Sequence, residues 1–299
     1  MSKRRSTPTR KIPRPTKRRS QVRADGSYDK IVDFGYLSFL LAANFYGESW
    51  LDARDSYRDA LLCGESWTLR KEIFPGYKAG RKVKRDGDAE KEATYQRVRD
   101  FRDYMRTDNT VHLVEHEGAE ADDLVVALSY RFPGIPIIGV DKDLTSSPGV
   151  WNRMITHKGE KPNPIWKKLP KYQANCKIAP WSLYLRQALI GDKSDSIPRL
   201  LPSNGAQAIW YDAYNPKQPL RSIMNFYDIY KEDLILNLQL VLIPTPLLMD
   251  NQFPTLESWF NSMIDGSYWL GNYFDGFCDR AMASMDQMGS DDSWDRFSQ

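Results

Sequence analysis

The chain has 299 residues, of which 41% are hydrophobic and 27% are charged, and it is long enough to bury the core of one large or two modest domains. Its three cysteines are too few and too far apart for a disulfide framework, and its three histidines are too scattered to indicate zinc. No apolar run is long enough to predict a membrane span. We expect a protein of the cytoplasm.

Residues 1–23 form a basic segment, rich in Pro, Ser and Thr, that contains ten Lys or Arg and no acid. The rest of the chain carries 32 basic and 39 acidic residues, which gives it a net charge of −7. Such a segment cannot bury a core, so we expect residues 1–27 to be a disordered tail. A basic arm on an acidic body indicates contact with a polyanion, although a solvated or targeting tail is the alternative.

After the tail, short apolar runs alternate with amphipathic segments. The runs predict buried strands at 30–34, 59–64, 110–115 and 135–140, with an edge strand at 150–156. The amphipathic segments between them, at 37–46, 88–106 and 120–131, predict helices. This alternation is typical of an α/β fold with a mostly parallel, doubly wound sheet. In such sheets, ligands bind beyond the carboxyl ends of the strands.

Acidic side chains follow each of the first four predicted strands. In chain order they are Asp33, then Glu65, then Glu120, Asp122 and Asp123, then Asp141 and Asp143. Carboxylates gathered at one edge repel one another unless positive charge lies among them, and no set of Lys or Arg matches these one for one. Oxygen ligands without His or Cys select Mg²⁺ or Mn²⁺ over zinc. The pattern predicts a divalent-metal site, and the alternative for the third group is a favourable interaction with a helix dipole.

Beyond residue 158 the pattern becomes helical. The stretch "LIGDKSDSIPRLLPSNGAQAIW", at 189–210, adds Asp192 and Asp195 and then a Pro/Gly-rich turn before a further predicted helix. A hairpin between two helices can offer backbone N–H groups to a phosphate. A capped helix end followed by an ordinary turn is the alternative. No phosphate-binding loop or dinucleotide-binding motif occurs in the sequence, so a nucleotide cofactor is unsupported.

Five motifs in order resemble the 5′-nuclease family of flap endonucleases and 5′→3′ exonucleases, which has a PIN-like fold. The motifs are "IVDFGYLSF", "ESWTLRKEIFPGYKAGRK", "EADD", "DKD" and "GDKSD", and the resemblance covers roughly residues 30–210. It implies an α/β nuclease domain at 28–160, including the arch through which a single strand passes. It also implies a helical DNA-binding region with a helix-hairpin-helix-like motif at 161–245. Residues 246–299 would be a C-terminal extension with an acidic tail.

The resemblance assigns roles to individual residues. The family's metal-site carboxylates fall on Asp33, Glu65, Glu120, Asp122, Asp141, Asp143 and Asp192, and the additional acids of its bacterial and phage members fall on Asp123 and Asp195. Arg70 and Lys78 fall where the family contacts the scissile phosphate. The arch residues would be Tyr77, Arg81 and Lys82, and the hairpin residues that contact DNA would be Lys193, Arg199 and Gly205.

Two departures from the family pattern concern the metal site and the hairpin. Glu65 stands where the second motif usually has Asp, and its side chain is one methylene longer. The family's Gly-x-Gly-x-Lys hairpin is reduced to "SNGAQA", with Gln207 in place of the lysine. The metal geometry can therefore shift, and the grip on DNA can be looser unless the basic tail compensates.

The resemblance implies a monomeric, structure-specific hydrolase of phosphodiester bonds that uses two Mg²⁺ ions, for which Mn²⁺ can substitute, in phage replication or recombination. Its partners would be DNA with 5′ ends, flaps or nicks, RNA–DNA hybrids, and a replication protein bound by the acidic tail. One alternative is a catalytically silent DNA-binding scaffold of the same fold. Another is a PIN-like ribonuclease that acts mainly on RNA. Parallel digestion of a DNA flap and an RNA–DNA hybrid separates these hypotheses.

Overall fold

The computed structural model of the chain describes a central α/β unit and several segments that pack on it. The described residues are 28–44, 54–65, 67–83, 88–108, 110–132, 135–141, 144, 152–156, 159–162, 184, 187–202, 221–248 and 272–287. The expected basic tail, the hairpin at 203–210 with Gly205, and the acidic C-terminus lie outside them, as does Asp143. No helix in this part of the chain is long and apolar enough to cross a membrane.

The central sheet has six strands in the order β3-β2-β1-β4-β5-β6. In chain order the strands are β1 (Lys30–Asp33), β2 (Ala60–Cys63), β3 (His112–Val114), β4 (Ile137–Ile138), β5 (Asn152–Thr156) and β6 (Gly159–Pro162). The pairs from β3 to β5 are parallel, whereas β6 runs antiparallel to β5. The carboxyl ends of β1, β2, β3 and β4 therefore meet at one edge of the sheet.

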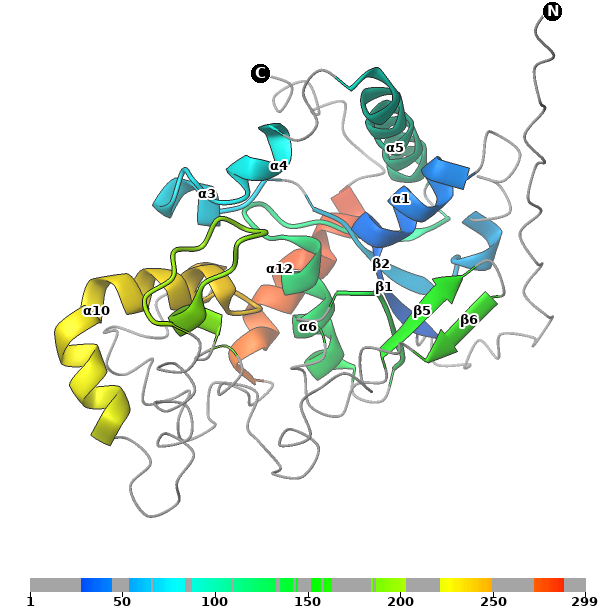
Figure 1. The fold of residues 1–299 in the computed structure, drawn as a ribbon. Coiled ribbons are helices and arrows are strands. Elements are labelled where there is room, and N and C mark those ends of the chain that lie inside the picture. Colours follow the sequence, from blue (N-terminus) through cyan, green and yellow to red (C-terminus); the bar gives the residue numbers. More distant parts are fainter. Residues whose placement is uncertain are drawn as a thin grey trace, which may run out of the picture.

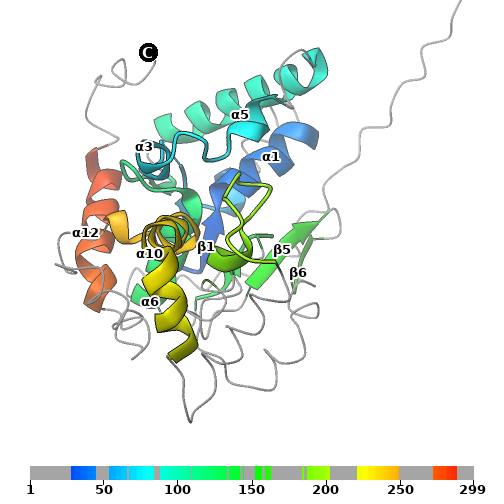
Figure 2. The same ribbon diagram turned by 60° about the vertical axis from the view of Figure 1, so that its left-hand side comes forward.

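Helices cover both faces of this sheet (Figure 1). Those of the α/β unit are α1 (Phe34–Asn44), α3 (Arg70–Ile73), α4 (Ala79–Val83), α5 (Ala89–Thr107) and α6 (Ala121–Arg131). Those further along the chain are α10 (Arg221–Val241), the 3₁₀ turn η3 (Pro246–Leu248) and α12 (Asn272–Gln287). Figure 2 shows α1 and α5 together on one side of β1, and α6, α10 and α12 on the other.

Two separate apolar clusters explain this three-layer arrangement. Successive strand residues point to opposite faces of a sheet, so alternate residues enter different clusters. Ile31 and Leu61 pack with α6, α10 and α12, whereas Val32 and Leu62 pack with α1 and α5. Because both faces are covered, β2 is apolar along its whole length and fully buried, as expected for a parallel strand.

The structure confirms the predicted α/β class and the mostly parallel, doubly wound sheet. The strands and helices predicted between residues 30 and 156 occur, with boundaries that differ by a few residues, whereas the helix predicted after the turn at 203–210 lies outside the described residues. One prediction was wrong: β5 is not an edge strand, because β6 pairs with it on its outer side. The charged segment that forms β6 carries no apolar alternation, so the pattern gave no sign of a strand there.

Candidate active site

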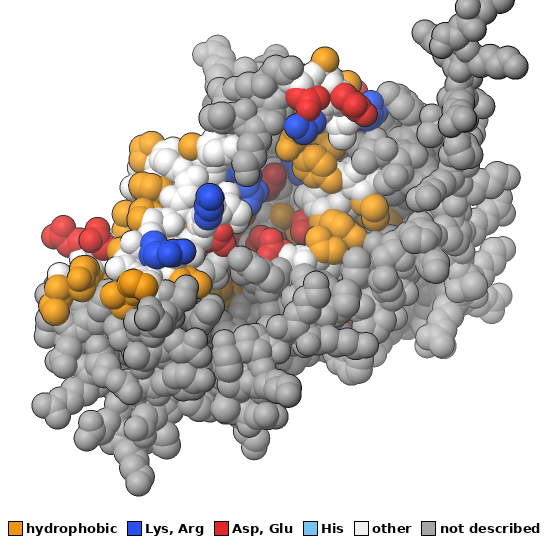
Figure 3. Space-filling view, in the orientation of Figure 1, with side chains coloured by type: hydrophobic (Ala, Val, Ile, Leu, Met, Phe, Trp, Pro, Cys, Tyr) orange, Lys and Arg blue, Asp and Glu red, His pale blue; other side chains and the backbone are white. Residues whose placement is uncertain are grey.

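A pocket of about 310 Å³ lies at the carboxyl ends of the parallel strands. Acidic side chains lie within this hollow, and Figure 3 shows basic side chains on one side of it and hydrophobic ones on the other. The basic residues that line the pocket include Lys78 and Arg81, and the hydrophobic ones include Tyr36 and Phe39 of α1. The pocket thus offers acidic, basic and apolar surfaces to one bound molecule.

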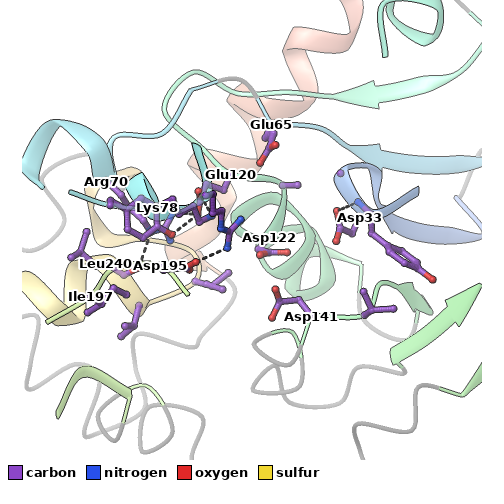
Figure 4. Close-up of a pocket in the computed structure, with 18 of the residues that line it drawn as sticks. Asp33, Glu65, Arg70, Lys78, Glu120, Asp122, Asp141, Asp195, Ile197 and Leu240 are labelled. Carbon is purple, nitrogen blue, oxygen red and sulfur yellow. Dashed lines mark hydrogen bonds and ion pairs between the residues drawn. The ribbon is translucent and has the colours of Figure 1, made fainter. Parts of the chain in front are cut away.

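Six predicted metal ligands line this pocket: Glu120 and Asp195, which are paired with Lys78 and Arg81, and the four carboxylates Asp33, Glu65, Asp122 and Asp141. Asp33 is the last residue of β1, Glu65 follows β2, Asp122 lies in the first turn of α6 after β3, and Asp141 follows β4. Figure 4 shows their side chains around a common space beside the Lys78–Glu120 cluster. The parallel topology brings together residues that are far apart in sequence, as the sequence predicted.

The buried carboxyls of Asp33 and Asp122 are held in an environment that disfavours their charge. Burial raises the pKa of Asp33 to about 6; the backbone N–H of Tyr36 opposes this, and Glu65 and Asp141 add to it. Burial also raises the pKa of Asp122 well above its ordinary value, and Asp33 and Asp141 raise it further. Carboxyls arranged in this way are stabilised by a proton or by a cation.

Arg70 is not available to a molecule in the pocket, because its guanidinium is saturated. Its side chain is 1% exposed. Nη1 and Nη2 each donate to one oxygen of Asp123 at 2.7 Å, and Nη1 also donates to Glu120 at 3.2 Å. Nε and Nη2 donate to the carbonyl oxygens of Leu240 and Leu242, at 3.0 and 2.7 Å. All five N–H donors of the arginine are thereby used.

Asp123 is saturated in the same way. Each of its oxygens accepts one hydrogen bond from Arg70 and one from a backbone N–H, that of Glu120 or that of Thr245, both at 2.9 Å. A carboxylate has about four acceptor positions, so none remains for a metal ion. The expectations that Arg70 contacts the scissile phosphate and that Asp123 binds metal are therefore corrected: both residues hold α3, α6 and the segment after α10 together.

Glu120, another predicted metal ligand, accepts hydrogen bonds from three neighbouring side chains. Its Oε2 accepts from Arg70 and from the hydroxyl of Tyr77 at 2.9 Å, and its Oε1 accepts from Lys78. Burial opposes ionisation of Glu120, but Arg70 and Lys78 outweigh it and lower its pKa. Tyr77, predicted for the arch, is buried, lines the pocket and donates its hydroxyl to Glu120.

Lys78 keeps its charge at the pocket. Burial works against the ammonium, but Glu120 and Asp195 outweigh it and raise its pKa. The backbone of Lys78 has a φ of +55°, and its N–H donates to the carbonyl oxygen of Asp195 at 2.9 Å. Asp195 in turn pairs with Arg81, whose side chain is 57% exposed. The loop before α4 and the loop at 191–197 therefore fix each other at the basic side of the pocket.

The remaining predicted residues lie elsewhere. Asp192 does not line the pocket; its carboxylate accepts from the backbone and hydroxyl of Ser194 and from Gln187. Lys193 and Arg199 are exposed and do not line the pocket either, and Arg199 donates to the carbonyl oxygen of Ile190. The structure does not describe the side chain of Lys82. Of the two acids in "GDKSD", Asp195 therefore lines the pocket, whereas Asp192 forms hydrogen bonds within its own loop.

Basic residues accompany part of the acidic cluster, and sequence reasoning had named all of them as site residues except Arg102. Arg70 and Lys78 neutralise Glu120, Arg81 pairs with Asp195, and Arg102 of α5 lies 3.5 Å from Glu65. Part of the cluster therefore has cations of its own, although the sequence showed no set of Lys or Arg that matches the acids one for one. Arg102 carried no motif, and the signal that could have found it was its place on the inner side of an amphipathic helix.

Among the described residues, no three His, Cys, Asp or Glu side chains form a ready-made metal cage. The pocket carboxylates nevertheless fit a divalent cation by chemistry, because they supply only hard oxygen donors. Burial raises the pKa of Asp33 and of Asp122, and neighbouring carboxylates raise both further, so a bound cation would favour their charged forms. Glu120, Asp123 and Asp195, by contrast, have cations of their own.

No protein-family model matches the chain, and no curated protein matches its sequence. Solved structures do match. The flap endonuclease of bacteriophage T5, in a pseudo-enzyme–product complex with DNA and metal ions, matches with a TM-score of 0.52 and 18% identity over 88% of this chain and 99% of that one. The T5 5′-exonuclease with zinc bound matches with a TM-score of 0.53 and 18% identity, over 87% and 98%. The chain therefore has the 5′-nuclease fold.

Proposed function

We propose that this protein is a metal-dependent 5′-nuclease that hydrolyses phosphodiester bonds near the 5′ ends of DNA. The observation that carries the proposal is the convergence of Asp33, Glu65, Asp122 and Asp141 on one pocket that Lys78 and Arg81 also line. Metal-catalysed hydrolysis of a phosphodiester needs carboxylates that bind the metal ions and cationic side chains that bind the phosphate. The fold, shared with DNA-bound and metal-bound nucleases of phage T5, supports the same conclusion.

The four pocket carboxylates would hold two Mg²⁺ ions, or Mn²⁺ in their place. When bound, such ions lower the pKa of a water molecule and stabilise the departing oxygen of a phosphodiester. The substrate would be DNA with 5′ ends, flaps or nicks, and the product would carry a 5′-phosphate. RNA–DNA hybrids are the second substrate class to test.

The chain's own residues would orient the phosphate. Lys78 lies at the pocket with its charge maintained, and it can offset charge that develops on the phosphate oxygens. Arg81 is paired with Asp195, but its side chain is 57% exposed and lines the pocket. It can therefore reach a strand that enters the pocket. Glu120, Tyr77 and Arg70 keep Lys78 in place; in this proposal Glu120 is a positioning residue and not a metal ligand.

The test is a cleavage assay on end-labelled substrates. A 5′-flap, a nicked duplex and an RNA–DNA hybrid are incubated with the protein in Mg²⁺, in Mn²⁺ or in EDTA. Cleavage should require the divalent ion and should fall by orders of magnitude in Asp122→Asn and Asp141→Asn. The control is Asp100→Asn, because Asp100 is exposed on α5 and contacts Gln96. Equal cleavage in EDTA would overturn the proposal, and preferred cleavage of RNA would change its substrate.

A further inference from the structure

Arg102 of α5 contacts α1 and Glu65, whereas Lys78 contacts Glu120. In Figure 4, Asp33, which ends the strand before α1, and Lys78 lie on different sides of the acidic cluster. The side chain of Arg102 is 15% exposed and lines the pocket. Its Nε donates to the hydroxyl of Ser38 at 3.0 Å, and that hydroxyl donates to the carbonyl oxygen of Gly35 at 2.9 Å. The guanidinium is therefore held against the first turn of α1, directly beside the strand end that carries Asp33.

The hydrogen bonds of Arg102 are incomplete. Its Nη2 is buried and has no hydrogen-bond partner within the described part of the structure. Its Nη1 is 3.5 Å from Glu65, which is longer than the usual charge-assisted hydrogen bond. One helical turn further along α5, Arg106 contacts both oxygens of Glu115 at 3.0 and 2.8 Å. The difference between these two arginines is that Arg102 faces the pocket.

A buried guanidinium donor without an acceptor costs free energy, and native proteins rarely leave one. An acceptor atom of a molecule in the pocket would complete the hydrogen bonds of Arg102. A guanidinium supplies parallel N–H donors that match the oxygens of a phosphate. Lys78 and Arg81 are already paired with Glu120 and Asp195, whereas the contact of Arg102 with Glu65 is loose.

We propose that Arg102 binds a phosphate of the nucleic-acid backbone and so forms a second cationic contact facing the Lys78–Arg81 side. This inference rests on the proposed function, because it assumes a nucleic-acid strand in the pocket. It adds that the strand is held from both sides, by α4 and the residues before it on one side and by α5 on the other. Tyr36 and Phe39 line the same α1–α5 side.

The test measures DNA binding without cleavage, in EDTA, over a series of salt concentrations. Arg102→Gln should weaken binding about tenfold. It should also flatten the slope of log K against log salt by the amount that one phosphate contact contributes. Arg99→Gln is the matched control: Arg99 is on the same helix, exposed, and paired with Glu92. It removes the same charge away from the pocket, so the slope should stay at the wild-type value. In Mg²⁺, Arg102→Gln should raise KM more than it lowers kcat.

Arg102→Lys keeps the charge but not the parallel donors, so it should restore the salt slope while binding stays weakened. It also serves if Arg102→Gln melts below the assay temperature. Wild-type binding and slope in Arg102→Gln, with loss only of kcat, would overturn the inference and leave Arg102 as the counter-ion of Glu65. That result would not affect the proposed function. A wild-type protein that neither binds nor cuts nucleic acid would overturn both.

Discussion

The guanidinium of Arg70 and the carboxylate of Asp123 form two hydrogen bonds of 2.7 Å inside the protein, although 53 residues separate them in sequence. Asp123 is fully buried, and Arg70 is almost so. The pair also binds the backbone at Leu240, Leu242 and Thr245, at and beyond the end of α10. It therefore connects the "ESWTLRKEIFPGYKAGRK" and "EADD" motifs to the segment at and just after the end of α10.

The first prediction concerns the stability of this pair. Arg70→Met should lower the free energy of unfolding by about 3–5 kcal/mol, because it leaves the Asp123 carboxylate buried without its cation. Adding Asp123→Asn should recover part of this loss, since Asn removes the charge and keeps one oxygen to accept from the backbone. Urea unfolding of the two single variants and the double variant gives the coupling energy. An Arg70→Met protein that has wild-type stability but cannot bind DNA would contradict this prediction and would support a contact between Arg70 and the scissile phosphate.

The second prediction concerns pH and Asp33 in metal-free protein. The folded-state pKa of about 6 lies above the ordinary value of 3.8, so ionisation of Asp33 destabilises the fold. The protonated Asp33 carboxyl therefore contributes stability that is fully present below pH 3.8. This contribution is lost as the pH rises through about 6. Asp33→Asn is neutral throughout and can still accept the hydrogen bond from Tyr36. Relative to wild type, it should gain about 3 kcal/mol between about pH 4 and about pH 7.

The measurement for Asp33 is a set of unfolding curves in EDTA at several pH values. Other groups titrate in both proteins, so only the difference between them is interpreted. A constant difference across the range would show that Asp33 ionises normally in the fold. Above about pH 6, added Mg²⁺ should reduce the difference in free energy of unfolding between the two proteins. The cation binds the charged Asp33 carboxylate of the wild type, and the neutral amide of the variant binds it less well.

The elements that the sequence predicted well are those whose side-chain period is unambiguous. β1, β2 and β3 are apolar runs, and α5 and α6 have clear amphipathic patterns and capping residues, so their places and the parallel order could be read directly. Parallel order alone then brings Asp33, Glu65, Asp122 and Asp141 to one edge. The four-residue helix α3 and the strand β6 are too short or too polar to carry a periodic signal.

The roles of individual charged residues could not be read from the sequence, because they depend on which side chain meets which. Asp122 and Asp123 are adjacent, yet one faces the pocket and the other faces away, since neighbouring residues on a helix point in different directions. Arg70 became structural because carbonyl oxygens at the end of α10 and just after it reach its guanidinium. Such contacts link residues 170 or more positions apart, and no local pattern reports them.

The third prediction concerns the basic segment 1–23, which carries ten of the 42 Lys and Arg residues. Deleting it should weaken DNA binding and flatten the salt slope in proportion to the number of phosphates that the segment neutralises. Cleavage at saturating protein should persist, because the pocket residues are untouched. Binding isotherms of the full-length and shortened proteins at several salt concentrations check this. Equal slopes would show that the segment does not contact nucleic acid.

The last prediction separates a metal-site role of Asp122 from simple helix capping. If Asp122 served only the helix dipole, Asp122→Asn would cost about 0.3–1 kcal/mol and leave cleavage near normal. The raised pKa of Asp122 argues for the opposite result, because burial and the nearby Asp33 and Asp141 disfavour its charge. Without metal, Asp122→Asn should therefore melt at the wild-type temperature or above it.

With Mg²⁺ the order should reverse. The ion should stabilise the wild type by an amount that grows with its concentration, and it should stabilise Asp122→Asn less, because one oxygen ligand has lost its charge. Melting curves with and without Mg²⁺, together with one cleavage assay, measure all three effects. A variant that is destabilised without metal and still cuts DNA would assign Asp122 to helix capping. A variant that is stable, inactive and insensitive to Mg²⁺ would place Asp122 among the residues that bind the ion.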